Sequence, residues 1–479
     1  MSTTVFDINE MLQKKGATNN EETVNERMTF EVVWREVKSY FDDLYNPANT
    51  TSSIPHDEIR KHQEYEHDAI LGKKESEKFL MNEIEEYLRN QNLLGIAYPN
   101  YYNGLAEACF HEIYKFGSFH QWQQYPDSPS AKIVGDEIWF KIKGKFKLMG
   151  HLRSEKHVEE IIRTLQIGEE SLIINSANPH AEVDMTDGTR VTILIPPRSH
   201  KPTIIFRRFV VKTFSFLEQA KFKTIDQEDI PFFETLAKLQ LNTIIAGPVE
   251  SGKSTFLKTM YGSRDEDLVA VLIESSPETF LKRDFPNRLV HDFYTMNSAV
   301  EDVFRAVLRV DHDYVIVQEV RGIEAEGAIL ATERGRRGLL MTYHITDPRR
   351  TPEQLARHIL DEFPNRKETN QIRRVANQID VGITMEAPPE LGGSQKRVTS
   401  IYEICYDFEK DEAWINYLMK YDRVNDKWFY NSNVSQLLKD RMYHHDRSLA
   451  DQFLAHLNKK ASEYPLLGET KFNCLFKED

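Results

Sequence analysis

The chain has 479 residues, of which 40% are hydrophobic and 28% are charged, and its formal net charge is −14. This composition indicates a globular protein of at least two domains and excludes a chain that is disordered, collagen-like or coiled-coil throughout. The excess of acid does not favour unspecific binding to nucleic acid or anionic lipid. Three widely spaced cysteines favour a reducing compartment over a disulfide framework or a thiolate zinc site.

The sequence lacks membrane-targeting patterns. No run reaches the ~18 apolar residues of a membrane-spanning helix. Residues 1–22 lack the basic and apolar regions of a secretory signal. We therefore expect a cytoplasmic protein, whose association with a membrane would be peripheral.

Residues 1–95 mix polar stretches with helical patterns. Residues 14–23 (KKGATNNEET) and 46–53 (NPANTTSS) are polar, whereas residues 30–45 and 77–90 carry apolar residues at helical spacing. This pattern predicts a mobile leader followed by helices.

Residues 96–225 predict a smaller α+β domain. Residues 134–150 (VGDEIWFKIKGKFKLMG) alternate in polarity around a glycine turn, as in a hairpin. Residues 155–165 show helical spacing, and Asp187-Gly188 lies between two alternating runs, which is a strong hairpin signal. Residues 203–210 (TIIFRRFV) supply a further strand.

From residue 226 to residue 479, strand and helix patterns alternate, which predicts a parallel sheet. Ser298 with Glu301, and Thr351 with Gln354, have the spacing of capping boxes at helix starts. Beyond about residue 393 the chain turns to hairpin-like segments and a polar helical tail, which we expect to form an appendage. The predicted strands are residues 243–247, 268–273, 314–317, 338–344 and 380–385.

Residues 247–254 read GPVESGKS and match the phosphate-binding loop pattern G-x-x-x-x-G-K-[ST]. The pattern needs glycines so that backbone N–H groups can surround phosphates, a lysine for the outer phosphates and a hydroxyl for Mg²⁺. A short apolar strand precedes the loop and a helix can follow it, as anion binding at a helix N-terminus requires. The predicted nucleotide contacts are Gly247, Val249, Glu250, Ser251, Gly252, Lys253, Ser254 and Thr255.

Three further side chains stand at the carboxyl ends of predicted strands, where open α/β sheets bind ligands. Glu274 and Glu319 could orient an attacking water or hold Mg²⁺. An isolated glutamate at such a place is more often solvated or ion-paired, and a histidine such as His344 is more often structural. The residues alone leave both interpretations open.

Four motifs, in their order, resemble those of the secretion traffic ATPases, the superfamily that powers type II and type IV secretion, conjugation and type IV pilus systems. The resemblance extends over about residues 95–405 and is closest to the secretion–conjugation branch. The motifs are the Walker A loop at residues 247–255, the Asp box at 273–278, the Walker B region at 311–325 and the His box at 338–348.

The resemblance implies an α/β fold in which a RecA-like P-loop ATPase domain with a parallel-rich sheet follows the smaller domain. It implies ATP and Mg²⁺ as ligands, with Lys253 on phosphate and Ser254 on Mg²⁺. Glu319 would activate water, Glu274 would support the metal, and His344 would sense the γ-phosphate.

Two positions depart from the family's pattern. Ser275 follows Glu274 where an aspartate is usual, and Gln318 precedes Glu319 where a glycine is usual. On the upstream strands, Arg190, Arg207 and Arg208 are either surface charges or, as the resemblance implies, groups that neutralise phosphate.

The resemblance also implies a homo-hexamer at the inner face of the cell membrane that contacts the channel proteins of a secretion or conjugation machine. We expect no sequence-specific contact with nucleic acid. Two alternatives stay open: a scaffold that binds nucleotide but hydrolyses it weakly, and a DNA translocase, which the acidic balance disfavours.

Overall fold

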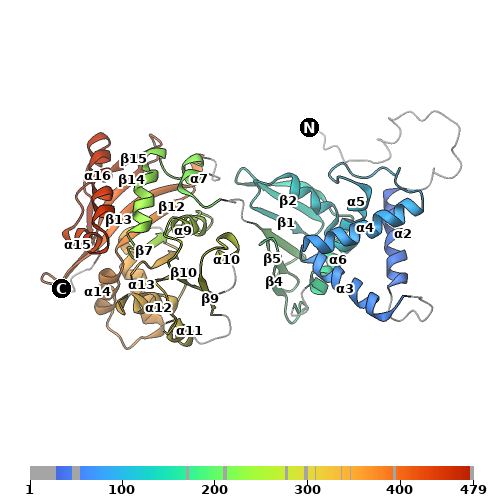
Figure 1. The fold of residues 1–479 in the computed structure, drawn as a ribbon, viewed down its shortest axis with the longest axis horizontal. Helices are drawn as coiled ribbons and strands as arrows, with labels where there is room; N and C mark the ends of the chain where they lie inside the picture. The colour runs from blue at the N-terminus through green and yellow to red at the C-terminus, as the bar shows by residue number, and fades with distance from the viewer. Residues whose placement is uncertain are drawn as a thin grey trace. The chain divides into compact units, whose positions relative to one another are not determined.

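The protein divides into two compact units, Met1–Val210 and Val211–Asp479 (Figure 1). The computed structural model describes residues 29–45, 54–168, 172–208, 213–275, 279–295, 300–307, 309–335, 337–345, 347–391 and 395–474. The polar stretches 14–23 and 46–53 and the capping residue Ser298 lie outside these ranges. Within these ranges, no helix is long and apolar enough to cross a membrane. The predicted domain boundaries at residues 95 and 225 stay predictions.

The first part of unit 1 is helical. The buried residues of α2, Val33, Trp34, Val37 and Phe41, recur at helical spacing, so one stripe of the helix faces the core. They pack with residues of α4 and α5 in one hydrophobic cluster. The helices are α2 (Phe30–Leu44), α3 (His56–Ile70), α4 (Lys74–Asn90), α5 (Leu105–Tyr114) and the 3₁₀ helix η1 (Gly117–Gln124).

The second part of unit 1 is an antiparallel sheet in the order β3-β2-β1-β6-β5-β4. Both predicted hairpins are present: Gly144 (φ 78°) closes the β2–β3 turn, and Gly188 (φ 82°) closes the β4–β5 turn. Helix α6 (Glu155–Gly168) packs its apolar stripe against the sheet. The strands are β1 (Ser130–Val134), β2 (Glu137–Ile142), β3 (Lys145–His151), β4 (His180–Asp184), β5 (Arg190–Leu194) and β6 (Thr203–Arg207).

Unit 2 is built on one large sheet in the order β15-β14-β13-β12-β7-β11-β10-β8-β9, with β16 beside β14. Neighbours from β12 to β9 are parallel, and those from β12 to β15 are antiparallel. The predicted α/β fold class is confirmed. The strands are β7 (Thr243–Ala246), β8 (Ala270–Glu274), β9 (Val290–Tyr294), β10 (Tyr314–Val320), β11 (Leu340–Tyr343), β12 (Val381–Glu386), β13 (Arg397–Asp407), β14 (Glu412–Asp422), β15 (Lys427–Tyr430) and β16 (Lys471–Asn473).

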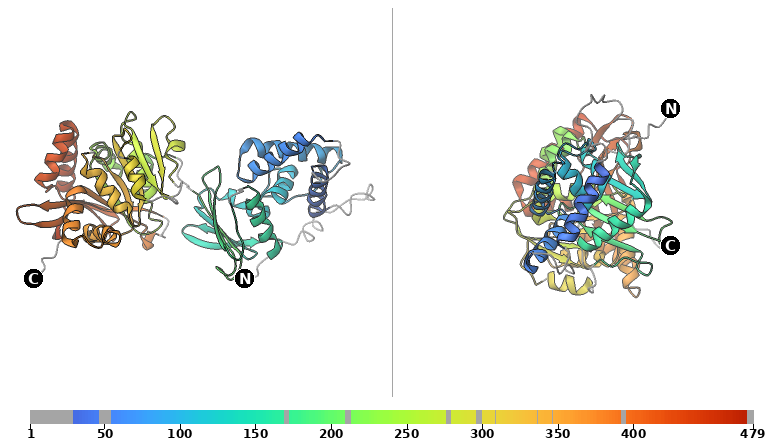
Figure 2. Two further views of the ribbon diagram at one scale, coloured as in Figure 1. Left: turned by 90° about the horizontal axis from the view of Figure 1, so that it is seen from below. Right: turned by 90° about the vertical axis from the view of Figure 1, so that its right-hand side faces the viewer.

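Helices cover both faces of this sheet (Figure 2). One core contains residues of α7 (Phe216–Lys221), α8 (Ile230–Lys238), α9 (Lys253–Gly262), α10 (Leu281–Asp284), α15 (Gln436–His445) and α16 (Arg447–Glu463). The other contains residues of α11 (Val300–Val307), α12 (Glu324–Glu333), α13 (Thr351–Glu362) and α14 (Glu368–Gln378). Short 3₁₀ helices are η2 (Gln227–Asp229), η3 (Pro348–Arg350) and η4 (Pro389–Leu391).

The predicted capping box at Thr351 is wrong. Thr351 is the first residue of α13, not its N-cap, and its side chain makes no cap hydrogen bond. Its hydroxyl donates instead to the Pro348 carbonyl (2.8 Å) and lies 3.0 Å from the Tyr402 hydroxyl. A 3₁₀ turn precedes α13, so the helical backbone begins before Thr351 and this residue lies inside the helix rather than at its N-cap.

Candidate functional site

The phosphate-binding loop joins β7 to α9. Gly247 has φ 149° and passes so close to β12 that a Cβ atom there would lie 2.1 Å from the Met385 carbonyl oxygen. Gly252 adopts φ 95° immediately before α9. Both positions therefore need glycine, the first for close backbone approach and the second for a left-handed conformation. The loop presents the N-terminus of α9 at the carboxyl edge of the sheet.

Lys253 is the buried cation of the loop. Its side chain is 7% exposed, and its ammonium donates to the carbonyls of Gly247 (3.0 Å) and Pro248 (2.9 Å). Burial lowers the pKa of Lys253 to about 8, and the charge of Glu319 opposes this shift. Within the described ranges no carboxylate lies at ion-pair distance from the ammonium. The loop thus holds a positive charge with no direct counter-ion.

Lys253, His344 and Glu319 form a chain of contacts across three neighbouring strands. The Lys253 Nζ atom lies 3.3 Å from His344 Nδ1, and His344 Nε2 lies 2.8 Å from Glu319 Oε1. The three residues meet because β7, β11 and β10 are adjacent and parallel, so their carboxyl ends share one edge.

The second oxygen of Glu319 is held by Arg321, whose guanidinium donates to Oε2 at 2.6 Å. Burial raises the pKa of Glu319, but the hydrogen bond and charge of Arg321, with the charges of His344 and Lys253, outweigh it and leave the pKa below its ordinary value. Glu319 is therefore an ionised carboxylate with both oxygens engaged. The Arg321 side chain is 62% exposed and can move away without disturbing the core.

Glu274 ends β8, the strand on the far side of β10. Its side chain is buried, and its Oε2 atom accepts from the backbone N–H (3.0 Å) and hydroxyl (2.7 Å) of Thr279. Ser275 follows it and is half-buried. Gln318 is buried in β10, and its carbonyl accepts from the Thr342 hydroxyl. The two residues that depart from the family pattern thus flank the two carboxylates.

The remaining loop residues differ in exposure. Val249 is 74% exposed, and Glu250 is exposed with φ 62°. Ser251 is buried, and its hydroxyl finds no hydrogen-bond partner in the part of the chain that the structure describes. Ser254 and Thr255 are half-buried in the first turn of α9. A buried hydroxyl without a partner is costly unless a ligand completes its hydrogen bonds.

The three arginines lie in unit 1. Arg190 and Arg207 are direct cross-strand partners on β5 and β6, and Arg190 Nε donates to Asp184 (3.1 Å). Arg208 donates to the carbonyls of Ser128, Trp122 and Tyr125, and its guanidinium lies 4.0 Å from the Trp122 ring centroid. Arg207 is exposed. Arg208 therefore holds the turn before β1 in place, whereas the guanidinium of Arg207 faces solvent.

Sequence reasoning missed two residues that shape the site. Thr279 orients Glu274, and only its place five residues further along the sequence hints at this. The backbone carbonyl of Met385 excludes a side chain at Gly247. No local sequence signal reveals this contact, because the two residues are 138 positions apart.

Comparisons with known proteins agree with these motifs. Residues 133–363 match the family described as type II/IV secretion system protein. An uncharacterised protein of Methanocaldococcus jannaschii is 23% identical over 282 residues, which cover 56% of this chain and 48% of that protein. The type IV secretion system protein VirB11 of Brucella suis is 29% identical over 151 residues, which cover 30% of this chain and 41% of that protein.

These alignments with the curated relatives span a third to a half of the relatives' own lengths. The solved structure of the Legionella pneumophila ATPase DotB aligns with 71% of this chain and 87% of that chain, at 14% identity and a TM-score of 0.44. The matched range of residues 133–363 contains the loop, both carboxylates and His344. Over these residues the chain is similar to the type II/IV secretion system protein family, and the predicted resemblance is confirmed.

Proposed function

We propose that unit 2 binds ATP with Mg²⁺ and hydrolyses it to ADP and phosphate, and that this reaction powers a secretion, conjugation or pilus-assembly machine. The observation that carries the proposal is the buried ammonium of Lys253, whose partners among the described residues are loop carbonyls and His344 but no carboxylate. A buried, uncompensated cation at a helix N-terminus is complementary to a polyphosphate.

The loop residues fit a phosphate group. The unpartnered Ser251 hydroxyl, the N-terminus of α9 and the Lys253 ammonium would all gain partners from phosphate oxygens. Ser254 and, from β8, Glu274 are the residues that would hold Mg²⁺. When bound, Mg²⁺ supplies positive charge that offsets the charge developing on the phosphate oxygens.

Glu319 is the proposed general base. It is ionised, because its pKa is lowered, so it can accept the proton of an attacking water. Its two oxygens are held by His344 and Arg321, and one must be released before it can face a water. The exposed Arg321 is the partner that can leave, while His344 links the base to Lys253 and so to the phosphates.

We propose that the working form is a homo-hexamer that contacts inner-membrane channel proteins from the cytoplasmic side. Arg190, Arg207 and Arg208 are proposed to face phosphate; Arg207 is exposed, Arg190 pairs with Asp184, and Arg208 would first have to leave its contacts with the Trp122 turn. Support comes from the family match and from the Brucella suis relative, which is a type IV secretion system protein.

A second candidate is a nucleotide-binding scaffold with weak hydrolysis. The ion pairs on both oxygens of Glu319 favour it, because they withhold the base from water. The bulk of Gln318 beside the base favours it as well.

The deciding experiment is single-turnover hydrolysis and ATP affinity for the wild type, Glu319→Gln and Glu274→Gln. We expect Glu319→Gln to bind ATP normally and to lose about a hundred- to a thousandfold in rate, as when one preorganised group is removed. Glu274→Gln should lose less. Glu353→Gln, which changes an ion-paired glutamate on α13, serves as the matched control.

Hydrolysis by Glu319→Gln within about threefold of a clearly active wild type would exclude Glu319 as the base. A wild type that is already slow, with a small further drop in the variant, would support the scaffold. Stimulation of phosphate release by added DNA would support the translocase alternative instead.

A further inference from the structure

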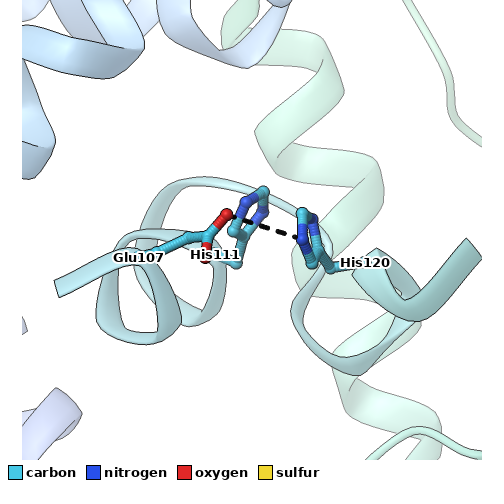
Figure 3. A group of neighbouring side chains, drawn as sticks. All are labelled: Glu107, His111 and His120. Atoms are coloured by element: carbon cyan, nitrogen blue, oxygen red, sulfur yellow. Dashed lines mark ion pairs between the residues drawn. The ribbon is translucent and has the colours of Figure 1, made fainter. Parts of the chain in front are cut away.

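Unit 1 contains a cluster of three potential metal ligands, Glu107, His111 and His120 (Figure 3). Glu107 and His111 stand four residues apart on α5 and so share one face of the helix. His120 comes from η1, after the chain has turned at Gly117. One ligand atom from each residue lies within 4.8 Å of the others, and His120 Nε2 lies 3.7 Å from Glu107 Oε1.

The two imidazoles pack against one another and against one tyrosine. The rings of His111 and His120 lie 3.8 Å apart between centroids, and Tyr102 stacks on both. Imidazole is the commonest metal ligand among side chains.

The two nearby lysines share one carboxylate partner. Glu77 pairs with Lys74 at 2.7 Å and with Lys115 at 3.0 Å. Glu77 therefore balances one of the two positive charges, and the repulsion that a bound cation would meet is reduced.

The carboxylate is held in place by its neighbour. The backbone N–H of Asn103 donates to Glu107 Oε2, and the Asn103 amide donates to Oε1 at 3.2 Å. Such outer contacts orient metal ligands in known sites. The ring nitrogens of His111 make no hydrogen bond or ion pair within the described ranges. A half-buried imidazole without a hydrogen bond has unused ligand capacity.

We propose that Glu107, His111 and His120 bind a divalent transition-metal ion, with Zn²⁺ as the best fit. Imidazole and carboxylate are borderline ligands that suit Zn²⁺, and two histidines with one glutamate leave a fourth position for water. Zn–N and Zn–O bonds of about 2.0–2.2 Å place tetrahedral ligand atoms about 3.3–3.5 Å apart. The 3.7 Å between His120 Nε2 and Glu107 Oε1 needs to close by a few tenths of an ångström, and the separations to His111, which lie within 4.8 Å, need to close by up to about 1.5 Å.

The bound ion would join two parts of unit 1. Helix α5 belongs to the helical core through Leu105, Cys109 and Phe110, whereas η1 belongs to the core of the sheet through Phe119 and Trp122. A metal held by both elements therefore cross-links the two cores across the turn at Gly117. The ion acts on the stability of unit 1 and leaves the phosphate-binding loop in unit 2 untouched.

The test uses the full chain without affinity tag, stripped of metal by a chelator and free of nucleotide. Zn²⁺ is titrated in competition with a chromophoric chelator, and Co²⁺ is added separately to read its visible absorption. We expect one Zn²⁺ per chain and a rise in the melting temperature. Glu107→Gln and His120→Ala should weaken the affinity by more than the roughly ten- to hundredfold that loss of an outer contact costs.

Controls separate this site from others. His151→Ala removes a histidine of the same unit that pairs with Asp136, and it should bind Zn²⁺ as the wild type does. Lys253→Ala should also bind Zn²⁺ normally, which excludes the phosphate-binding loop as the source. Circular dichroism of the metal-free variants verifies that they fold.

Three results would overturn the proposal: no stoichiometric Zn²⁺ at micromolar concentration, wild-type affinity in folded Glu107→Gln or His120→Ala, or equal loss in His151→Ala. Any of these results would mean that the cluster binds no metal and that its two imidazoles only stack on Tyr102.

Discussion

Replacing Lys253 by methionine tests whether the phosphate-binding loop holds a positive charge that has no counter-ion. Methionine keeps most of the aliphatic volume and removes the ammonium. The wild-type lysine has a folded-state pKa of about 8 against 10.5 for the exposed group, because its side chain is buried. A lysine whose pKa is lowered by folding destabilises the folded state at pH 7, and this penalty disappears as the pH rises from about 8 to 10.5.

The magnitude follows from the shift. Between pH 7 and pH 10 the unfolded lysine stays largely protonated while the folded one loses its proton, which spans about 2 pKa units, or about 2.7 kcal/mol. Solvent reaches part of the loop, so we halve this to about 1.4 kcal/mol. The hydrogen bonds to the carbonyls of Gly247 and Pro248 survive deprotonation, because a neutral amine still donates, and they cancel from the comparison between the two pH values.

The assay is the melting temperature of wild type and Lys253→Met at pH 7 and pH 10, without nucleotide. The difference between wild type and variant should move by about 3–5 °C in favour of the wild type at pH 10, given about 2–4 °C per kcal/mol for domains of about 150–250 residues. Other titrating groups are common to both proteins. A difference that is the same at both pH values would refute the buried-charge argument, and normal ATP binding by the variant would refute the phosphate contact.

Two further changes test the geometry of the site. Gly247→Ala should lower the melting temperature more than Gly252→Ala does, and it should abolish ATP binding. The Cβ atom of an alanine at position 247 would meet the Met385 carbonyl, whereas one at position 252 would have only side-chain atoms at 3.4 Å or beyond. Equal melting temperatures of the two variants would contradict this. Arg321→Ala removes a group that lowers the pKa of Glu319, so the acid limb of the hydrolysis rate against pH should move to higher pH. An unchanged acid limb would show that Glu319 is not the group whose titration sets the pH dependence of hydrolysis.

Local signals in the sequence predicted the elements whose causes are local. The GPVESGKS loop, the Gly188 hairpin and the strands 243–247 and 314–317 are all present, because turn glycines and apolar runs act over a few residues. The capping box at Thr351 failed for a local reason as well, since a 3₁₀ turn started the helix earlier. Sequence spacing alone does not distinguish an N-cap from a first helical residue.

Contacts that depend on strand order lay beyond sequence reasoning. Glu319 and His344 were predicted one by one, but their contact with each other and with Lys253 requires β11 to lie between β7 and β10. Arg208 is a similar case, because its carbonyl partners lie 80 to 86 residues away in the sequence. The pairing of Arg321 with Glu319 is a local contact instead, since two residues of separation at a strand end put them within reach.

The charges at the site decide what it can bind and when it can react. Lys253 and Arg321 carry positive charge and Glu319 is the carboxylate they share, so the cluster is cationic before any ligand arrives. A polyphosphate would satisfy Lys253 and weaken the attraction that holds Glu319 to it through His344. The exposed guanidinium of Arg321 could then turn from the carboxylate toward the new negative charge. Binding of the substrate would thereby release the base. This coupling predicts that the rate of ATP hydrolysis by Arg321→Ala depends less on whether phosphate occupies the loop than the rate of the wild type does.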